Sequence, residues 1–374
     1  MLNLKRKIWV IIGTRPELLK QLPVYYQFVK KFGRKNVILV NSGQHKDFLN
    51  FYSKESKIKF DLTLTDLQST NSLIKNIKKS VEIFYKILAI NKPKLVLVQG
   101  DTTTAAGCAF AANLAGVTIA HNEAGLRTFD NKNPFPEELN RKLITSVADI
   151  HFAPTKLSMK NLIKEGVEKS KIYIVGNSGI DSFFSFLKRR NDDVGQKIIK
   201  YAQQNSKKIV FLTAHRREAR GKNLDKCFKA LKVFFNKNKN FLLVCPEHPN
   251  KFALNSINKY LKKLDNFYLT KPLSYLSTCK LIFNSSFVVT DSGGIQEECS
   301  SIGVPVVVCR EKTERQEVLD LKIGKLTGFN IKNILKVLNW AKKKEVNLKR
   351  WKYRPYGDGR ASLKIANLVK KLLI

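Results

Sequence analysis

Short apolar runs alternate with longer amphipathic stretches along the first half of the chain. The runs are rich in valine and isoleucine without alternating polar positions, which is typical of strands buried on both faces of a parallel sheet. They predict strands at Ile8–Ile12, Val37–Val40, Leu95–Val98, Val117–Ala120, Ile150–Ala153 and Ile172–Val175. The stretches Leu18–Phe32 and Asn71–Asn91 have helical periodicity, so the order of elements indicates repeated βαβ units.

The same alternation starts again in the second half of the chain. It predicts strands at Ile209–Thr213, Phe241–Cys245, Phe267–Leu269, Phe287–Thr290 and Val304–Cys309, with lysine-rich helical stretches within 188–208 and 223–239. We therefore expect an α/β protein made of two Rossmann-like, doubly wound domains, residues 1–178 and 179–357. Residues 358–374 predict a closing helix, with Ala361, Ile365, Leu368 and Leu372 on its apolar face, that packs back on the first domain.

The net charge is unusual for such a protein. The 374 residues include 68 basic and 30 acidic side chains, a formal charge of +38, and 43% are hydrophobic. Only 15 of the basic residues are arginine, and the lysines are scattered rather than clustered. Specific readers of nucleic acid favour arginine and interleaved aromatic residues, so we expect no specific nucleic-acid partner, and only a weak, salt-sensitive attraction to polyanions.

The cysteines and the amino-terminal residues bear on the compartment. None of the six cysteines forms a C-x-x-C pair, which favours buried free thiols in a reducing compartment. The run Ile8–Ile12 follows basic residues but is too short for a signal peptide. No run approaches the length of a membrane span, so a soluble, cytoplasmic protein without a membrane partner is expected.

Three acidic residues follow apolar runs within one stretch of the chain. Asp101 follows the predicted strand that ends at Val98, Glu123 follows the next one, and Glu137 lies in a Pro-Phe-Pro-Glu-Glu segment. The carboxyl edge of a parallel sheet is where ligands bind, and several acids there suggest proton transfer. The alternative is structural: Asp101 caps a helix and Glu123 pairs with Arg127.

A glycine-containing turn in the second half predicts a phosphate site. The predicted strand ending at Thr290 is followed by Ser292, Gly293 and Gly294 and then by a helix that carries Glu298. Backbone N–H groups and the helix dipole at such a turn favour an anion, and Glu298 is placed to accept hydrogen bonds from ribose hydroxyls. The alternative is an ordinary strand-to-helix turn.

Basic residues near the predicted strand ends are further candidates for phosphate contacts. Arg15 and Lys20 follow the first strand, and His215 stands beside two arginines at the end of the first strand of the second half, where it suits phosphate contact or proton transfer. Arg315 is a fourth candidate; the alternative is a surface ion pair with Glu314 or Glu317.

Taken together, these segments resemble the non-hydrolysing UDP-N-acetylglucosamine 2-epimerases. The matching segments run through nearly the whole chain: Gly13–Glu17, Ser42–His45, Gly100–Thr102, Glu123–Thr128, Pro134–Glu138 with Asn140-Arg141, Gly176-Asn177, His215–Glu218, His248–Asn250, Asp291–Glu298, Thr313–Arg315 and Pro355–Asp358. The resemblance implies a GT-B-like fold with the active site in the interdomain cleft. It also implies reversible inversion at C2 of a UDP-linked 2-acetamido sugar, UDP-GlcNAc to UDP-ManNAc, by elimination and re-addition of UDP for surface polysaccharide synthesis.

The resemblance also assigns roles to residues. It gives Asp101, Glu123, Glu137 and His215 to catalysis, and places Leu273 and Thr278 at the ends of a loop that borders the uracil. Gln44, His45 and His248 match a site where many family members bind a second UDP-GlcNAc as activator, although Ser69 stands near the place of an arginine of that site. A homodimer without metal or other cofactor is implied.

Other functions remain open from the sequence. They are the same chemistry on a modified UDP-sugar, a GT-B glycosyltransferase, and a non-catalytic protein that binds polyanions or UDP-sugars.

Overall fold

The described residues fold into two separate parallel sheets. The computed structural model describes residues 4–44, 58–64, 67, 70, 72–189, 194–213, 222–247, 251–344 (backbone only over 251–253) and 351–373. The chain divides into two compact units: Met1–Ser182 with Tyr356–Ile374, and Phe183–Pro355. The domain limits expected from the sequence, at residues 178 and 357, stay predictions.

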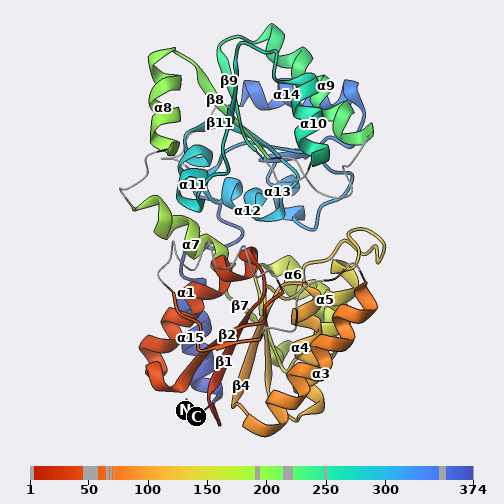
Figure 1. Ribbon diagram of the computed structural model, residues 1–374, viewed down its shortest axis with the longest axis vertical. Coiled ribbons are helices and arrows are strands. Elements are labelled where there is room, and N and C mark those ends of the chain that lie inside the picture. Colours follow the sequence, from red (N-terminus) through yellow and green to blue (C-terminus); the bar gives the residue numbers. More distant parts are fainter. Residues whose placement is uncertain are drawn as a thin grey trace. The chain divides into compact units, whose positions relative to one another are not determined.

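The first unit is built on a seven-stranded sheet of order β3-β2-β1-β4-β5-β6-β7, parallel throughout (Figure 1). This is the strand order of a Rossmann fold, and the direction of the order reverses between β1 and β4. Its strands are β1 (Ile8–Ile12), β2 (Val37–Asn41), β3 (Leu62–Thr63), β4 (Leu95–Gln99), β5 (Ile119–Asn122), β6 (Ile150–Ala153) and β7 (Ile172–Ile174).

Helices surround this sheet, and the C-terminal helix belongs to it. They are α1 (Arg15–Phe32), α3 (Leu73–Asn91), α4 (Thr103–Leu114), α5 (Glu137–Val147), α6 (Lys156–Lys164), the start of α7 (Ser178–Leu187) and α15 (Ala361–Leu372), with 3-10 turns at Arg34–Asn36 and Lys169–Lys171. Helix α15 packs along α1, where the two lie side by side in Figure 1. Asp181 on α7 accepts hydrogen bonds from the N–H groups of Ala361 and Ser362, which ties down the start of α15.

The second unit repeats the plan with a six-stranded parallel sheet of order β10-β9-β8-β11-β12-β13. The order again reverses beside its first strand, between β8 and β11. Its elements are α8 (Val194–Gln204), β8 (Lys208–Thr213), α9 (Lys222–Lys237), β9 (Phe241–Pro246), α10 (Lys251–Tyr260), β10 (Phe267–Thr270), α11 (Tyr275–Phe283), β11 (Ser285–Thr290), α12 (Gly293–Ile302), β12 (Val306–Val308), α13 (Gln316–Asp320), β13 (Gly324–Leu326) and α14 (Ile331–Lys343).

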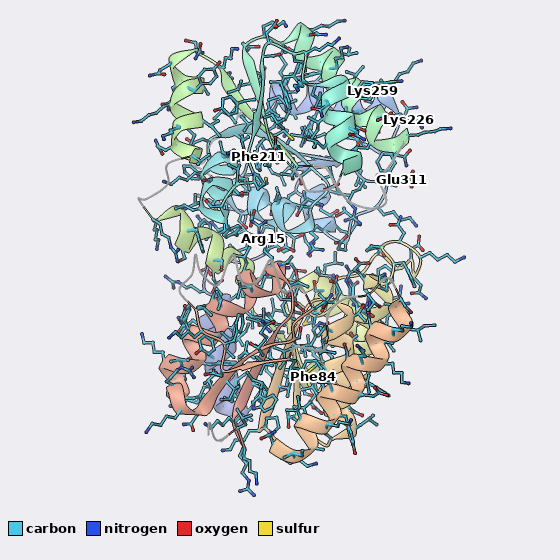
Figure 2. All side chains as sticks on the ribbon, in the orientation of Figure 1. Arg15, Phe84, Phe211, Lys226, Lys259 and Glu311 are labelled. Carbon is cyan, nitrogen blue, oxygen red and sulfur yellow. The ribbon has the colours of Figure 1, made fainter. Side chains whose placement is uncertain are left out.

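Each unit has its own apolar core. Phe84 in the first and Phe211 in the second are completely buried and lie inside their units in Figure 2. In the first core α4 packs closely on α3, because a Cβ on Gly107 would lie only 2.5 Å from the Cβ of Ser80. All six cysteines are buried and free, as the sequence predicted.

Candidate active site

The three predicted acids lie on elements that meet at the carboxyl edge of the first sheet. Asp101 follows β4, Glu123 follows β5, and these strands are neighbours. Glu137 begins α5, and the next turn of that helix is joined to the β4–α4 turn, where Asn140 Nδ2 donates to the carbonyl of Asp101 over 2.9 Å. Arg15 begins α1 directly after β1, the other neighbour of β4. Residues 15, 101, 123 and 137 therefore belong to one edge of one unit.

Glu123 is the most enclosed of the three acids, with 5% of its surface exposed. Lys20 Nζ lies 2.5 Å from its Oε1 and 2.6 Å from its Oε2. Asn177 Nδ2 donates to Oε1 over 2.9 Å, and Gln99 Nε2 donates to Oε2. Side chains from α1, from β4 and from the turn before α7 therefore fix the position of this carboxylate.

The structural alternative for Glu123 is wrong, because Arg127 pairs with a different acid. Arg127 Nε and Nη2 donate to the two carboxylate oxygens of Glu165 over 2.8 and 2.6 Å. Arg127 thereby holds the loop after β5, and Glu123 forms its ion pair with Lys20 instead.

Asp101 is held by an arginine fork rather than used as a helix cap. Arg141 Nε and Nη2 donate to its Oδ2 over 3.0 and 2.6 Å, while 30% of the Asp101 side chain stays exposed. The cap of α4 is Thr102, whose Oγ1 accepts from the N–H of Ala105 over 3.0 Å. The capping role considered for Asp101 is therefore wrong, and its carboxylate is partly open to solvent.

Glu137 and Glu138 are adjacent but have different surroundings. Glu138 is fully buried; its Oε2 accepts from Arg141 over 2.6 Å and its Oε1 from the N–H groups of Thr128 and Phe129. Glu137 is half-buried, and its Oε2 is shielded from solvent with no hydrogen-bond partner among the described residues. Glu138 therefore belongs to the internal ion-pair network, whereas Glu137 has an oxygen available to a ligand.

In the second unit the glycine turn lies where the strand order reverses. Thr213 at the end of β8 and Thr290 at the end of β11 are side by side, with their Oγ1 atoms 2.8 Å apart. Ser292 is the N-cap of α12 and makes no side-chain cap hydrogen bond. A Cβ on Gly293 would lie 2.8 Å from Arg315 Cζ, whereas one on Gly294 would meet nothing within 4 Å. The structure thus explains Gly293 by packing and leaves Gly294 open.

Arg315 lies in a buried ion-pair network behind this turn. Its Nε donates to Glu297 Oε1 over 2.7 Å and its Nη1 donates to Glu314 Oε1. Glu314 also accepts from Arg310 over 2.9 Å. The ion pair with Glu314 considered from the sequence is present, but it is buried rather than on the surface. Its charge is balanced by two carboxylates, so direct phosphate contact by Arg315 stays a prediction.

The predicted nucleoside contacts also lie in the second unit. Tyr275 O–H donates to Glu298 Oε1 over 2.6 Å, and burial raises the pKa of Tyr275. Leu273 is buried, and the hydroxyl of Thr278 donates to the carbonyl of Ser274 over 3.0 Å. The carboxylate predicted to accept from ribose is therefore oriented by a tyrosine.

Comparison with known proteins identifies the family. The family model described as UDP-N-acetylglucosamine 2-epimerase matches residues 29–370. The chain belongs to this family. A UDP-N-acetylglucosamine 2-epimerase of Campylobacter jejuni is 38% identical, with 98% of each chain covered, and one of Bacillus subtilis (strain 168) is 33% identical, covering 96% of this chain and 94% of the relative.

Solved structures of the family align with nearly the whole chain. A structure described as an S. aureus MnaA-UDP co-structure has a TM-score of 0.89 at 34% identity, covering 98% of this chain and 97% of the other. The UDP-GlcNAc 2-epimerase from Neisseria meningitidis bound to UDP-GlcNAc has a TM-score of 0.88 at 32% identity, covering 98% and 100%. The UDP-N-acetylglucosamine 2-epimerase fold expected from the sequence, α/β and GT-B-like with two Rossmann-like halves, is confirmed.

Three of the expected residues of this epimerase family, His215, His45 and His248, lie outside the described residues. Gln44 is described; its Oε1 accepts from the hydroxyl of Thr104. Among the described residues no group of three or more histidine, cysteine or acidic side chains is arranged to hold a metal ion. No helix within the described part of the chain is both long and apolar enough to span a bilayer.

The structure adds supporting residues that sequence reasoning did not single out. Glu17, buried on α1, accepts from the N–H groups of Gly13 and Thr14 and from the hydroxyl of Thr102, so it joins the turns after β1 and β4; burial raises its pKa. His121 Nε2 lies 2.8 Å from the carbonyl oxygen of Gly100. Glu17 follows an Arg-Pro pair in the first matched segment, and His121 is two residues before Glu123. Their closeness in sequence to predicted site residues could have pointed to both.

Proposed function

We propose that this epimerase inverts C2 of UDP-GlcNAc to give UDP-ManNAc, by elimination and re-addition of UDP. One structural observation supports this most strongly: a buried carboxylate, Glu123, held by three donors beside a partly exposed one, Asp101. Membership in the UDP-N-acetylglucosamine 2-epimerase family supports the substrate.

The chemistry requires more than one acid. The C2 hydrogen is not next to a carbonyl, so a base alone removes it too slowly, and departure of UDP has to lead. In the elimination a carboxylate takes the C2 proton, the C–H electrons form the C1=C2 bond, and the C1–O bond breaks with its electrons leaving on UDP. In the addition the UDP oxygen bonds to C1, and C2 receives a proton on the opposite face. Carboxylates also stabilise the positive charge that develops near C1.

Different residues carry out these tasks. Asp101, Glu123 and Glu137 move protons and stabilise charge, and the order of base and acid among them is left to experiment. Arg15, His215 and the turn formed by Ser292–Gly294 hold the free diphosphate, where the N-terminus of α12 supplies N–H groups and a favourable dipole. Glu298, oriented by Tyr275, accepts from the ribose.

Proton NMR in deuterium oxide tests the proposal with UDP-GlcNAc as the sole sugar. We expect signals of UDP-ManNAc and deuterium at C2 in both sugars. Glu123→Gln and Glu137→Gln should abolish the exchange while UDP still binds. Unchanged UDP-GlcNAc without an acceptor would contradict the proposal and favour a glycosyltransferase; exchange only with a modified UDP-sugar would change the substrate.

The setting of the enzyme is also part of the proposal. We propose a cytoplasmic homodimer that supplies a precursor of surface polysaccharide; the resemblance supports the dimer, and six buried free thiols suit a reducing compartment. Light scattering combined with size exclusion tests the dimer. A monomer at assay concentration would contradict it.

A further inference from the structure

Two matched segments, Gly176-Asn177 and Pro355–Asp358, have no role in the mechanism above, yet they cross each other. The N–H of Asn177 donates to the carbonyl of Tyr356 over 2.7 Å. A Cβ on Gly176 would lie 3.0 Å from that same oxygen, and one on Gly357 would lie 3.2 Å from the Cα of Gly176. Both glycines have φ in the left-handed region, +93° and +103°, so both the conformation and the close approach favour glycine.

Asn177, which lies at this crossing, also contacts the carboxylate of Glu123. Asn177 is 1% exposed. Its Oδ1 accepts from the N–H of Gly179 over 2.9 Å, which turns its Nδ2 toward Glu123 Oε1, also 2.9 Å away. One asparagine therefore joins three parts of the unit: its own turn, the carboxylate and the segment at Tyr356.

The two segments at this crossing are far apart in the sequence. The chain leaves the first unit after Ser182 and returns to it at Tyr356. The residue that accepts from the N–H of Asn177 is thus the first residue of the returning segment, 179 positions away in the sequence. The first 182 residues alone therefore lack the acceptor for the backbone N–H of Asn177.

We infer that Asn177 is a positioning residue for Glu123 and that the returning segment, Tyr356-Gly357, acts on catalysis through Asn177. The inference rests on the proposed function, since it takes Glu123 as a proton-transferring group. Small misplacements of a reacting group lower rates by about 10²-fold, so a shift of the returning segment should be seen in kcat. It should leave UDP binding unchanged, because neither Asn177 nor Tyr356-Gly357 is among the residues proposed to hold the diphosphate.

A double-mutant cycle tests the route of coupling in the full-length protein. Asn177→Ala removes the side-chain Nδ2 that donates to Glu123, and Gly357→Ala places a Cβ against Gly176. Each should lower kcat by at least about tenfold with the Kd of UDP within about twofold, and the double variant should be no slower than Asn177→Ala alone, because interacting sites are not additive. If the reductions in kcat of the two single variants multiplied in the double variant, the inference would be overturned.

Gln99 provides the matched control. It donates to the other oxygen of Glu123, so Gln99→Ala should also lower kcat, but its effect should multiply with that of Gly357→Ala. If it combined with Gly357→Ala as Asn177→Ala does, the returning segment would act on the whole edge rather than through Asn177, and the inference would fail.

A further variant covers the case in which Gly357→Ala does not fold. Asn177→Asp keeps the size and the acceptor but places a second carboxylate beside Glu123, so kcat should fall below that of Asn177→Ala with UDP binding retained. A kcat equal to that of the wild type would contradict the inference. The wild-type exchange is measured first: its absence would refute the proposed function, whereas an active wild type with multiplying effects would refute this inference alone.

Discussion

Lys20 and Glu123 form a largely buried ion pair at the edge of the first sheet, with Nζ 2.5 and 2.6 Å from the two carboxylate oxygens. The sequence suggested a phosphate contact for Lys20, and the structure shows it beside a catalytic candidate. Gly179 leaves room for this arrangement, because a Cβ there would lie 3.3 Å from Lys20 Cγ. The pair therefore offers a direct test of which role dominates.

We predict that Lys20→Met lowers kcat by about 100-fold, because Glu123 loses the cation that holds its carboxylate and misplacement of a reacting group by about 1 Å costs about 10²-fold in rate. The Kd of UDP, measured by calorimetry, should stay within about twofold. Lys20→Arg keeps the charge and is expected to retain more activity. A large rise in the Kd of UDP with kcat unchanged would instead support the phosphate contact.

The adjacent acids on α5 make a matched pair of variants. Glu138→Gln leaves buried Arg141 with one fewer carboxylate partner, so we expect about 3–5 kcal/mol less stability and a Tm lower by several degrees. Glu137→Gln should leave Tm nearly unchanged and abolish C2 exchange. Thermal unfolding and the deuterium assay measure both variants, and loss of stability in Glu137→Gln with exchange retained would reverse the assignment.

The glycines of the second unit separate packing from ligand approach. Gly293→Ala places a Cβ 2.8 Å from Arg315 Cζ, so stability and UDP affinity should both fall. Gly294→Ala meets no atom within 4 Å, and within a helix it should add up to about 1 kcal/mol of stability. If phosphate approaches this backbone, Gly294→Ala should still weaken UDP binding by about tenfold or more. Unchanged UDP affinity in Gly294→Ala would place the diphosphate elsewhere.

The fold could be predicted from the sequence because its strands are continuous apolar runs. Strand β1 was predicted at Ile8–Ile12 and β6 at Ile150–Ala153, which are their observed bounds. Two edge strands were not predicted, β3 with two residues and β13 with three, because such short pairings leave no periodic signal. Helix α4 was also not singled out, since its small, largely buried residues give no polar face.

The sequence could predict where the site lies but not which basic side chain pairs with which carboxylate. A carboxylate after an apolar run identifies a sheet edge, so residues 101 and 123 could be placed together. Which cation faces which acid depends on contacts over large sequence separations. Glu123 is paired with Lys20 and Arg127 with Glu165, although Arg127 is nearer to Glu123 in sequence. The support from Asn177 and Tyr356 needs three separate segments and has no local sign.

Two buried histidines predict an acid-sensitive first unit. His121 on β5 and His151 on β6 are register partners, and burial lowers the pKa of His121 to about 3 and that of His151 to about 4, with further lowering from Arg127. Above pH 6.5 both are neutral in the folded and unfolded states and contribute nothing to the pH dependence. As the pH falls from 6.5 toward these folded values only the unfolded chain gains protons, so each lowers the free energy of unfolding by up to about 1.4 kcal/mol per pH unit.

The variant His121→Gln isolates this contribution. The glutamine amide can donate toward the carbonyl of Gly100 as His121 Nε2 does, but it does not titrate. Glu17 and Asp181, whose pKa values burial raises, act in the opposite direction, but they are present in both proteins and cancel in the comparison. Denaturant unfolding between pH 7 and 4.5 should give a shallower loss of stability for the variant, by up to about 1.4 kcal/mol per pH unit. Parallel curves for the two proteins would show that His121 takes up protons in the folded state as readily as in the unfolded chain.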